Sequence, residues 1–198
     1  MNERGLLVVQ PTRVVPRKGI ELAIDLVGRL RDRHAVLLIT SPAGDEGLDY
    51  LVEMEQMAER HGVDLRYAAD RFAPDHEGKP LRPAHSLHDA YLAADLITYP
   101  SLYEGFGNAL LEALFYGVPV LVNRYSVYVA DIAPLGLKLI EIDGEITDAT
   151  VATVKSLLAS PDRIRANARH NFEIARQHLS YRVLRRRLRR LLDDLVPA

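Results

Sequence analysis

The chain of 198 residues has no cysteine, no long apolar run and almost no net charge. Without cysteine it can form neither disulfide bonds nor thiolate metal sites, and thiol redox chemistry is excluded. No stretch approaches the roughly 20 apolar residues of a membrane-spanning helix, and the first residues lack the basic-then-apolar order of a signal peptide. We therefore expect a cytoplasmic protein. The formal net charge of -2 gives no overall attraction to nucleic acid, so we expect any anion-binding site to be local.

Apolar residues make up 48% of the chain, which is enough for one well-buried core, and we expect residues 1–198 to form a single domain. Short apolar runs alternate with stretches of helical spacing. The runs, which predict strands, cover residues 6–9, 35–39, 64–67, 96–99, 118–122 and 137–142. The helical stretches cover residues 19–33, 48–61, 86–93, 108–116, 147–158, 161–178 and 181–195. This alternation predicts an α/β fold with a doubly wound, Rossmann-like parallel sheet, in which the first run is a central strand.

Residues 68–85 interrupt the alternation with Asp, Pro, Gly and charged residues. We expect an exposed loop of unusual length there, and such loops often carry function. Ser86, with Asp89 three residues later, indicates the N-terminal cap of the next helix.

A basic loop, residues 11–19, joins the first predicted strand to the first predicted helix. In doubly wound sheets, ligands bind beyond the carboxyl ends of the strands, which is where this loop lies. The helix N-terminus presents free N–H groups, and Arg13 and Lys18 could add charge-assisted bonds, an arrangement that suits a diphosphate. That these are merely solvated loop cations is an equally open alternative.

A second candidate segment, residues 101–113, contains a carboxylate, two glycines and the start of an apolar helix. Gly105 and Gly107 would let backbone N–H groups approach a phosphate or sugar closely. Glu104 could instead be a helix-start carboxylate and Glu112 a solvated position. Because Glu112 lies among apolar residues, where an unpaired carboxylate is costly if buried, we favour a functional role. The segment is neither a dinucleotide fingerprint nor a phosphate loop.

These residues together resemble a known enzyme family. Glu104 and Glu112 flank seven residues, Tyr116-Gly117-Val118-Pro119-Val120 follows, and Arg13, Lys18 and Gly19 come after the first strand. The pattern, over residues 5–195, resembles the carboxy-terminal, donor-binding domain of the group-1, or family 4, retaining glycosyltransferases. That resemblance implies one half of a GT-B architecture, with additional helices at its carboxyl end.

The resemblance also implies a role for each matching position. Arg13 and Lys18 would neutralise the donor diphosphate in place of a metal, so that no metal or cofactor is expected and a nucleoside-diphosphate sugar is the co-substrate. Glu104 would be the catalytic residue that orients the transferred sugar, and Glu112 would accept hydrogen bonds from the ribose. The sugar and distal phosphate would contact Glu104, Gly105, Phe106, Gly107, Asn108 and Ala109. The base would lie against Ala69, Asp70, Arg71 and Phe72.

The expected function is therefore donor binding in a retaining glycosyltransferase of the hexosyltransferase type. The acceptor, a glycan, lipid or small molecule, would be held by an amino-terminal domain that this chain lacks, so we expect the chain to be inactive alone. Two alternatives stay open: a non-catalytic nucleotide-sugar-binding or partner subunit, and a nucleotide-sugar epimerase of GT-B architecture.

The last predicted helix combines six arginines with a stripe of leucines, Leu184, Leu188, Leu191 and Leu195. Such a helix could lie on an anionic membrane, which would make the protein membrane-peripheral. We favour packing of the stripe on the domain, with the arginines outward. RNA binding is disfavoured, because aromatic residues do not alternate with the arginines.

Overall fold

Six parallel strands form one sheet at the centre of the protein. The computed structural model describes residues 5–43, 48–72 and 85–195. The strand order is β3-β2-β1-β4-β5-β6, so the first strand is central, as predicted. The strands are β1 (Leu7–Gln10), β2 (Val36–Ile39), β3 (Asp64–Tyr67), β4 (Leu96–Tyr99), β5 (Val120–Asn123) and β6 (Ile140–Ile142). This Rossmann-like topology confirms the predicted fold class.

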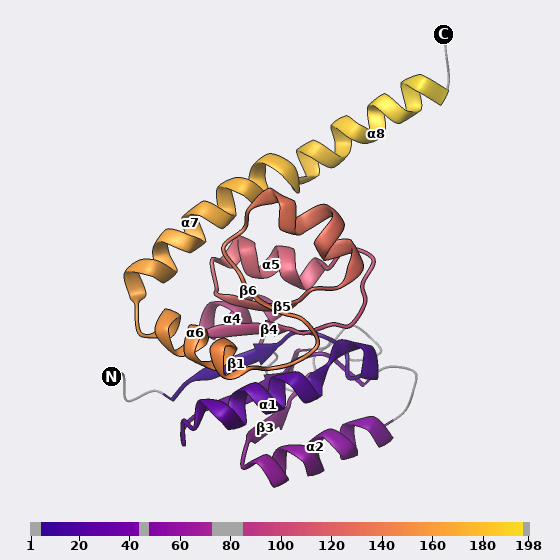
Figure 1. Ribbon diagram of the computed structural model, residues 1–198. Coiled ribbons are helices and arrows are strands. Elements are labelled where there is room, and N and C mark those ends of the chain that lie inside the picture. Colours follow the sequence, from indigo (N-terminus) through magenta and orange to yellow (C-terminus); the bar gives the residue numbers. More distant parts are fainter. Residues whose placement is uncertain (1–4, 44–47, 73–84, 196–198) are drawn as a thin grey trace.

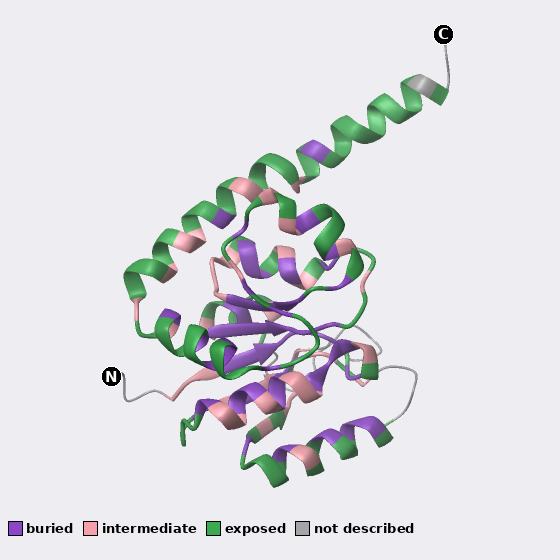
Figure 2. Ribbon diagram, viewed as in Figure 1, coloured by how far each residue is buried: buried purple, intermediate pink, exposed green. Residues whose placement is uncertain are grey.

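Helices cover both faces of the sheet (Figure 1). Successive residues of a strand point to opposite faces, and β1 shows this directly. Val8 packs in a core with α1 (Ile20–Leu30), α2 (Asp49–His61) and α6 (Asp148–Leu158). Val9 packs in a second core with α4 (Leu87–Ala93) and α5 (Asn108–Tyr116). The central strands β1, β4 and β5 are mostly buried in Figure 2, because both faces are covered there, whereas the edge strand β3 has no buried residue.

Two segments differ from the sequence prediction. Residues 69–72 form a short helix, α3 (Ala69–Phe72), where a loop was predicted, because Ala69 is buried and the Arg71 N–H bonds the Ala68 carbonyl. The part of that loop at residues 73–84 lies outside the described residues. Residues 128–135 form η2 (Tyr128–Ile132) and η3 (Ala133–Leu135), where no element was predicted. Tyr128 and Ile132, both fully buried, hold this segment on the second core.

The helix N-terminal cap predicted at Ser86 is present. Ser86 accepts a bond from the Asp89 N–H, and the Asp89 carboxylate accepts one from the Ser86 N–H, which is a complete capping box at the start of α4.

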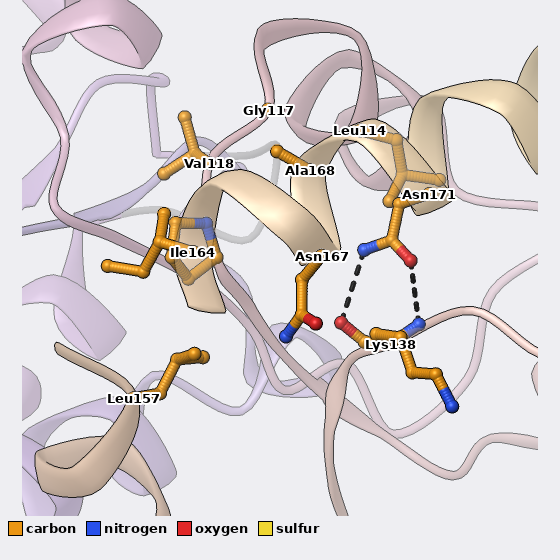
Figure 3. A pocket seen from close by; sticks show the side chains of 10 residues that line it. Leu114, Gly117, Val118, Lys138, Leu157, Ile164, Asn167, Ala168 and Asn171 are labelled. Carbon is orange, nitrogen blue, oxygen red and sulfur yellow. Dashed lines mark hydrogen bonds between the residues drawn. The ribbon is translucent and has the colours of Figure 1, made fainter. Parts of the chain in front are cut away.

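Helix α7 (Pro161–His178) is fastened to the domain by a buried amide. The Lys138 backbone N–H donates to Asn171 Oδ1 at 2.6 Å, and Asn171 Nδ2 donates to the Lys138 carbonyl at 3.1 Å (Figure 3). The adjoining cavity, between α5, α6 and α7, holds only about 10 Å³. That space suits at most one water molecule, so this region is a packing contact and does not form a ligand site.

The last helix, α8 (Tyr181–Leu195), points away from the sheet (Figure 1). Most of α8 is exposed in Figure 2. The leucines of its stripe are 50–76% exposed, and Val183 is buried. The expectation that the stripe packs on this domain is therefore wrong, because α8 extends beyond the described elements that could cover it. No helix of the described chain is both long and apolar enough to cross a membrane.

Candidate functional site

Two loops meet at the point where the strand order reverses, beyond the carboxyl ends of β1 and β4. The Leu102 N–H, after β4, donates to the Arg17 carbonyl, after β1, at 2.8 Å. Gly19 has a φ of 63°, and a Cβ there would lie 2.4 Å from the Pro100 carbonyl oxygen. Only glycine allows this approach, so Gly19 brings the two candidate segments together. Crevices at such reversal points are where open α/β sheets bind ligands.

A buried polar network supports the first loop from below. Gln10, at the end of β1, is fully buried, and its Nε2 donates to the Lys18 carbonyl at 3.1 Å. The hydroxyl of Thr98 on β4 donates to Gln10 Oε1 at 3.3 Å. Pro16 begins the short helix η1 (Pro16–Lys18), where its missing N–H costs nothing. The backbone that carries Lys18 is thus fixed before any ligand binds.

Glu104 is held between two cations from that loop. Lys18 Nζ bonds Glu104 Oε1 directly, and Arg17 Nη1 lies 3.4 Å from the same oxygen. The Lys18 and Glu104 side chains are only 10% and 12% exposed. Burial tends to raise the pKa of Glu104, but the bond to Lys18 and the nearby positive charges outweigh burial, and the pKa lies below its ordinary value of 4.5. Glu104 is therefore ionised at neutral pH.

An open cleft of about 420 Å³ lies over this ion pair. The volume falls in the range of small-molecule sites, and the charged side chains around it are three cations and one carboxylate. Arg13, Lys18, Glu104 and residues 106–109 were predicted as site residues, and the structure brings them together here. The full lining is Pro11, Thr12, Arg13, Arg17, Lys18, Ser41, Tyr99, Glu104, Phe106, Gly107, Asn108 and Ala109.

The turn before α5 is shaped by Gly107 and two buried tyrosines. Gly107 has a φ of 111°, and a Cβ there would lie 3.0 Å from the phenol oxygens of both Tyr99 and Tyr125. The Tyr125 hydroxyl donates to the Phe106 carbonyl at 2.7 Å. Gly105, by contrast, does not have a positive φ and does not line the cleft. Of the two glycines, Gly107 is the one whose conformation requires glycine.

Glu112 lies outside the lining of this cleft. It is exposed on α5, where its Oε2 accepts a hydrogen bond from the Tyr91 hydroxyl at 2.8 Å. The same hydroxyl lies 3.3 Å from the carbonyl oxygen of Ala109, which does line the cleft. Glu112 is therefore about one helical turn behind the cleft wall, with a partner different from those of Glu104.

The four residues predicted to contact a base are also outside the cleft lining. Ala69 is buried in α3, Asp70 and Arg71 are exposed, and Phe72 packs against the second core. The structure thus does not bring these residues together with the ion pair.

Several residues of the cleft were missed by sequence reasoning. Arg17 was visible in the same basic loop as Lys18, and Ser41 and Tyr99 lie at the carboxyl ends of β2 and β4, where ligand contacts are expected. Nothing in the sequence indicated that Tyr125 bonds the Phe106 carbonyl, because Tyr125 follows Phe106 by 19 positions. In the part of the chain that the structure describes, no three His, Asp or Glu side chains gather to hold a metal.

The protein is therefore a Rossmann-like domain with a cationic cleft at the reversal point of its sheet, the place where open α/β sheets bind ligands. The family model described as "Glycosyl transferases group 1" matches residues 5–160, and the chain belongs to this family. The resemblance inferred from the paired glutamates is thereby confirmed at the level of the family.

Relatives support the same family. The chain is similar to mannosylglucosylglycerate synthase of Thermotoga maritima, with 32% identity in an alignment 206 positions long; the match covers 88% of this chain and 46% of the synthase. The fold matches that of Anabaena HepE in complex with UDP and glucose, with a TM-score of 0.77, 17% identity, and coverage of 96% of this chain and 49% of HepE. The chain thus spans less than half the length of both proteins.

One solved structure has nearly the same extent as this chain. It is the C-terminal domain of a group 1 family glycosyl transferase from Francisella tularensis, with a TM-score of 0.69 and 16% identity. The match covers 89% of this chain and 87% of that domain. At these low identities, the two structural matches show a shared fold.

Proposed function

We propose that the chain is the C-terminal, donor-binding domain of a retaining, metal-independent glycosyltransferase of GT-B architecture. The reaction would transfer a hexose from a nucleoside-diphosphate sugar to a glycan, lipid or small-molecule acceptor, in the cytoplasm. The observation that carries this proposal is the cleft at the reversal point of the sheet, which is lined by Arg13, Arg17, Lys18 and Glu104.

The charges of the cleft fit the departure of a nucleoside diphosphate. When the bond from sugar to phosphate breaks, negative charge develops on the diphosphate. Arg13 and Lys18, with Arg17 beside them, would stabilise that charge from fixed positions, and the N–H groups at the start of α5 would add to it. These cations would take the place that a divalent metal has in other phosphate-transfer sites.

Glu104 would orient the transferred sugar. Its present partner, Lys18, would turn to the diphosphate when the donor binds, and the carboxylate would then accept bonds from sugar hydroxyls. The lowered pKa supports this role, because an ionised carboxylate is a strong hydrogen-bond acceptor. Phe106 to Ala109, which line the cleft, and Gly105 beside them would hold the sugar and the distal phosphate.

The remaining donor contacts would lie beyond the cleft wall. Glu112, one turn behind Ala109, would accept bonds from the ribose hydroxyls. Residues 69–72 of α3 would contact the base. An extended ligand is required to join these positions to the ion pair, and a nucleoside-diphosphate sugar has that length and order of groups.

An amino-terminal domain would supply the acceptor site. The match in extent to the C-terminal domain from Francisella supports this assignment, as does coverage of less than half of the Thermotoga synthase. The exposed leucine stripe of α8 also supports it, since an uncovered apolar face marks a surface for interaction. The domain alone would then bind donor without transferring sugar.

Calorimetric titration with UDP, GDP and ADP, with and without magnesium, tests the donor site. We expect one nucleotide to bind without magnesium, and Lys18→Ala and Glu112→Ala each to weaken binding. Arg66→Ala serves as a control, because Arg66 forms an exposed ion pair with Asp64 outside the cleft. Absence of binding by all three nucleotides at millimolar concentration would contradict the proposal, and a magnesium requirement would contradict metal independence.

A further inference from the structure

We propose that Tyr91 is a positioning residue for Glu112: its hydroxyl holds one carboxylate oxygen so that the other is presented to the ribose of the donor. This inference rests on the proposed donor-binding function. It adds a residue from α4, an element outside both candidate segments, to the ribose site.

The geometry places the Tyr91 hydroxyl between the cleft wall and Glu112. It donates to Glu112 Oε2 at 2.8 Å and lies 3.3 Å from the Ala109 carbonyl oxygen, so the phenol is next to both residues of α5. A carboxylate has about four acceptor positions on two oxygens. The bond from Tyr91 uses Oε2 and leaves Oε1 for a ligand hydroxyl.

The ring of Tyr91 is itself fixed. Tyr91 is 1% exposed, and its ring stacks on that of Tyr116, with centroids 5.1 Å apart and an angle of 20° between the planes. The Tyr116 hydroxyl is in turn 2.8 Å from His88 Nδ1. A phenol held in this way has a single position, and its position decides that of the Glu112 carboxylate.

Tyr91 also keeps its proton over a wide pH range. Burial, followed by the bond to Glu112 and its charge, raises the pKa of Tyr91 well above the ordinary value of 10. The hydroxyl is therefore protonated at neutral pH and donates to the carboxylate of Glu112 before the ligand arrives. Pre-orientation of this kind improves affinity, because the flexible side chain loses less freedom on binding.

The test compares each of UDP, GDP and ADP with its 2′,3′-dideoxy analogue, which lacks the ribose hydroxyls. The wild-type domain should bind one ribonucleotide more tightly than its analogue. Tyr91→Phe keeps the ring and its stacking but removes the donor. It should weaken binding of that ribonucleotide by about 2- to 10-fold, the range for loss of one hydrogen bond, and leave binding of the analogue unchanged.

Two further variants sharpen the comparison. Glu112→Ala should abolish the preference for the ribonucleotide over its dideoxy analogue. Adding Tyr91→Phe to Glu112→Ala should have no further effect, since the phenol acts through the carboxylate. Tyr128→Phe is the matched control, because Tyr128 is another buried phenol that donates to a carboxylate, Glu141 Oε1 at 2.7 Å. Tyr128→Phe should leave the ratio of the two affinities, for ribonucleotide and for analogue, at the wild-type value.

The possible failures are distinguishable. If the wild type binds no nucleotide, the proposed function is wrong. If it binds ribonucleotide and analogue equally, the ribose role of Glu112 is wrong, and with it that of Tyr91. If Tyr91→Phe binds like the wild type, or weakens both ligands by the same factor, the positioning role of Tyr91 alone is refuted.

Discussion

Gly19 offers the most direct test of how the cleft is assembled. Its substitution by alanine would introduce a Cβ 2.4 Å from the Pro100 carbonyl oxygen, closer than the 3.0 Å below which real Cβ atoms essentially never approach. One of the two loops would have to move by more than half an ångström. That movement would separate the loop carrying Lys18 from the loop carrying Glu104.

The loss of folding stability that we expect for Gly19→Ala has two parts. The first is the left-handed backbone at Gly19, with φ 63°, which costs a residue with a Cβ about 1–2 kcal/mol. The smaller entropy of alanine in the unfolded chain offsets about 0.4–1 kcal/mol of this. The second part is the steric contact itself, for which overpacking of a tight site costs about 1–3 kcal/mol. We expect a total destabilisation of about 2–4 kcal/mol.

Gly62 provides a matched control, because it has nearly the same backbone, φ 65°, and an added Cβ would meet nothing within 4 Å. Gly62→Ala should therefore cost only about 0.5–1 kcal/mol, the backbone part alone. Urea unfolding of the two variants measures both losses of stability, provided that the dependence of the unfolding free energy on urea concentration is the same as in the wild type. Titration with the nucleotide that binds best should show weaker binding for Gly19→Ala and unchanged binding for Gly62→Ala.

Equal destabilisation by the two substitutions would refute this reasoning. The close approach to Pro100 would then contribute nothing, and Gly19 would be required only for its backbone conformation. Nucleotide binding unaffected by Gly19→Ala would likewise show that the contact between the two loops does not align the cleft.

Three other substitutions test the electrostatics and packing. Glu104→Gln should destabilise the fold at pH 7, and the difference in stability from wild type should shrink below pH 4.5. A carboxyl group whose pKa is lowered in the folded state stabilises the fold above its unfolded pKa, and this effect is lost as the pH falls through the folded pKa. Urea unfolding midpoints at several pH values measure the difference. Tyr125→Phe should cost about 0.5–1.5 kcal/mol of stability and weaken donor binding, because it removes the hydrogen bond that holds the Phe106 carbonyl. Burial raises the pKa of Tyr125 to about 12, so this hydrogen bond is present at neutral pH in the wild type. Unaltered binding in calorimetry would contradict this role. Asn171→Ala should cost about 1–3 kcal/mol in thermal or urea unfolding, because both hydrogen bonds from the buried Asn171 side chain to the Lys138 backbone are lost. A cost below about 1 kcal/mol would show that water replaces the amide.

The elements of the sheet were predictable because their signals are local. The apolar run at residues 6–9 indicated a central buried strand, and the structure places β1 between β2 and β4. The Ser86 cap likewise needs only residues within one turn. Where the signal was short or irregular, prediction failed. The segment at 128–135 forms around two buried side chains, which are too few to give a period.

Part of the candidate site could also be predicted. Arg13, Lys18 and Glu104 follow strands whose carboxyl ends lie at the same edge of a parallel sheet, so the rules of topology bring them near one another. Their assignment to a donor diphosphate and sugar stays a prediction until nucleotide binding is measured.

The sequence by itself determined the alternation of strands and helices, the family, and the residues that can carry charge after each strand. Only the tertiary structure decided which of those charges meet. Lys18 and Glu104 are 86 positions apart, and Tyr91 and Glu112 come from different helices. Only the tertiary structure decided, too, that the leucines of α8 are left uncovered. The physical reason is that periodicity reports which face of an element is apolar, whereas its neighbour in space is fixed by how the whole chain packs.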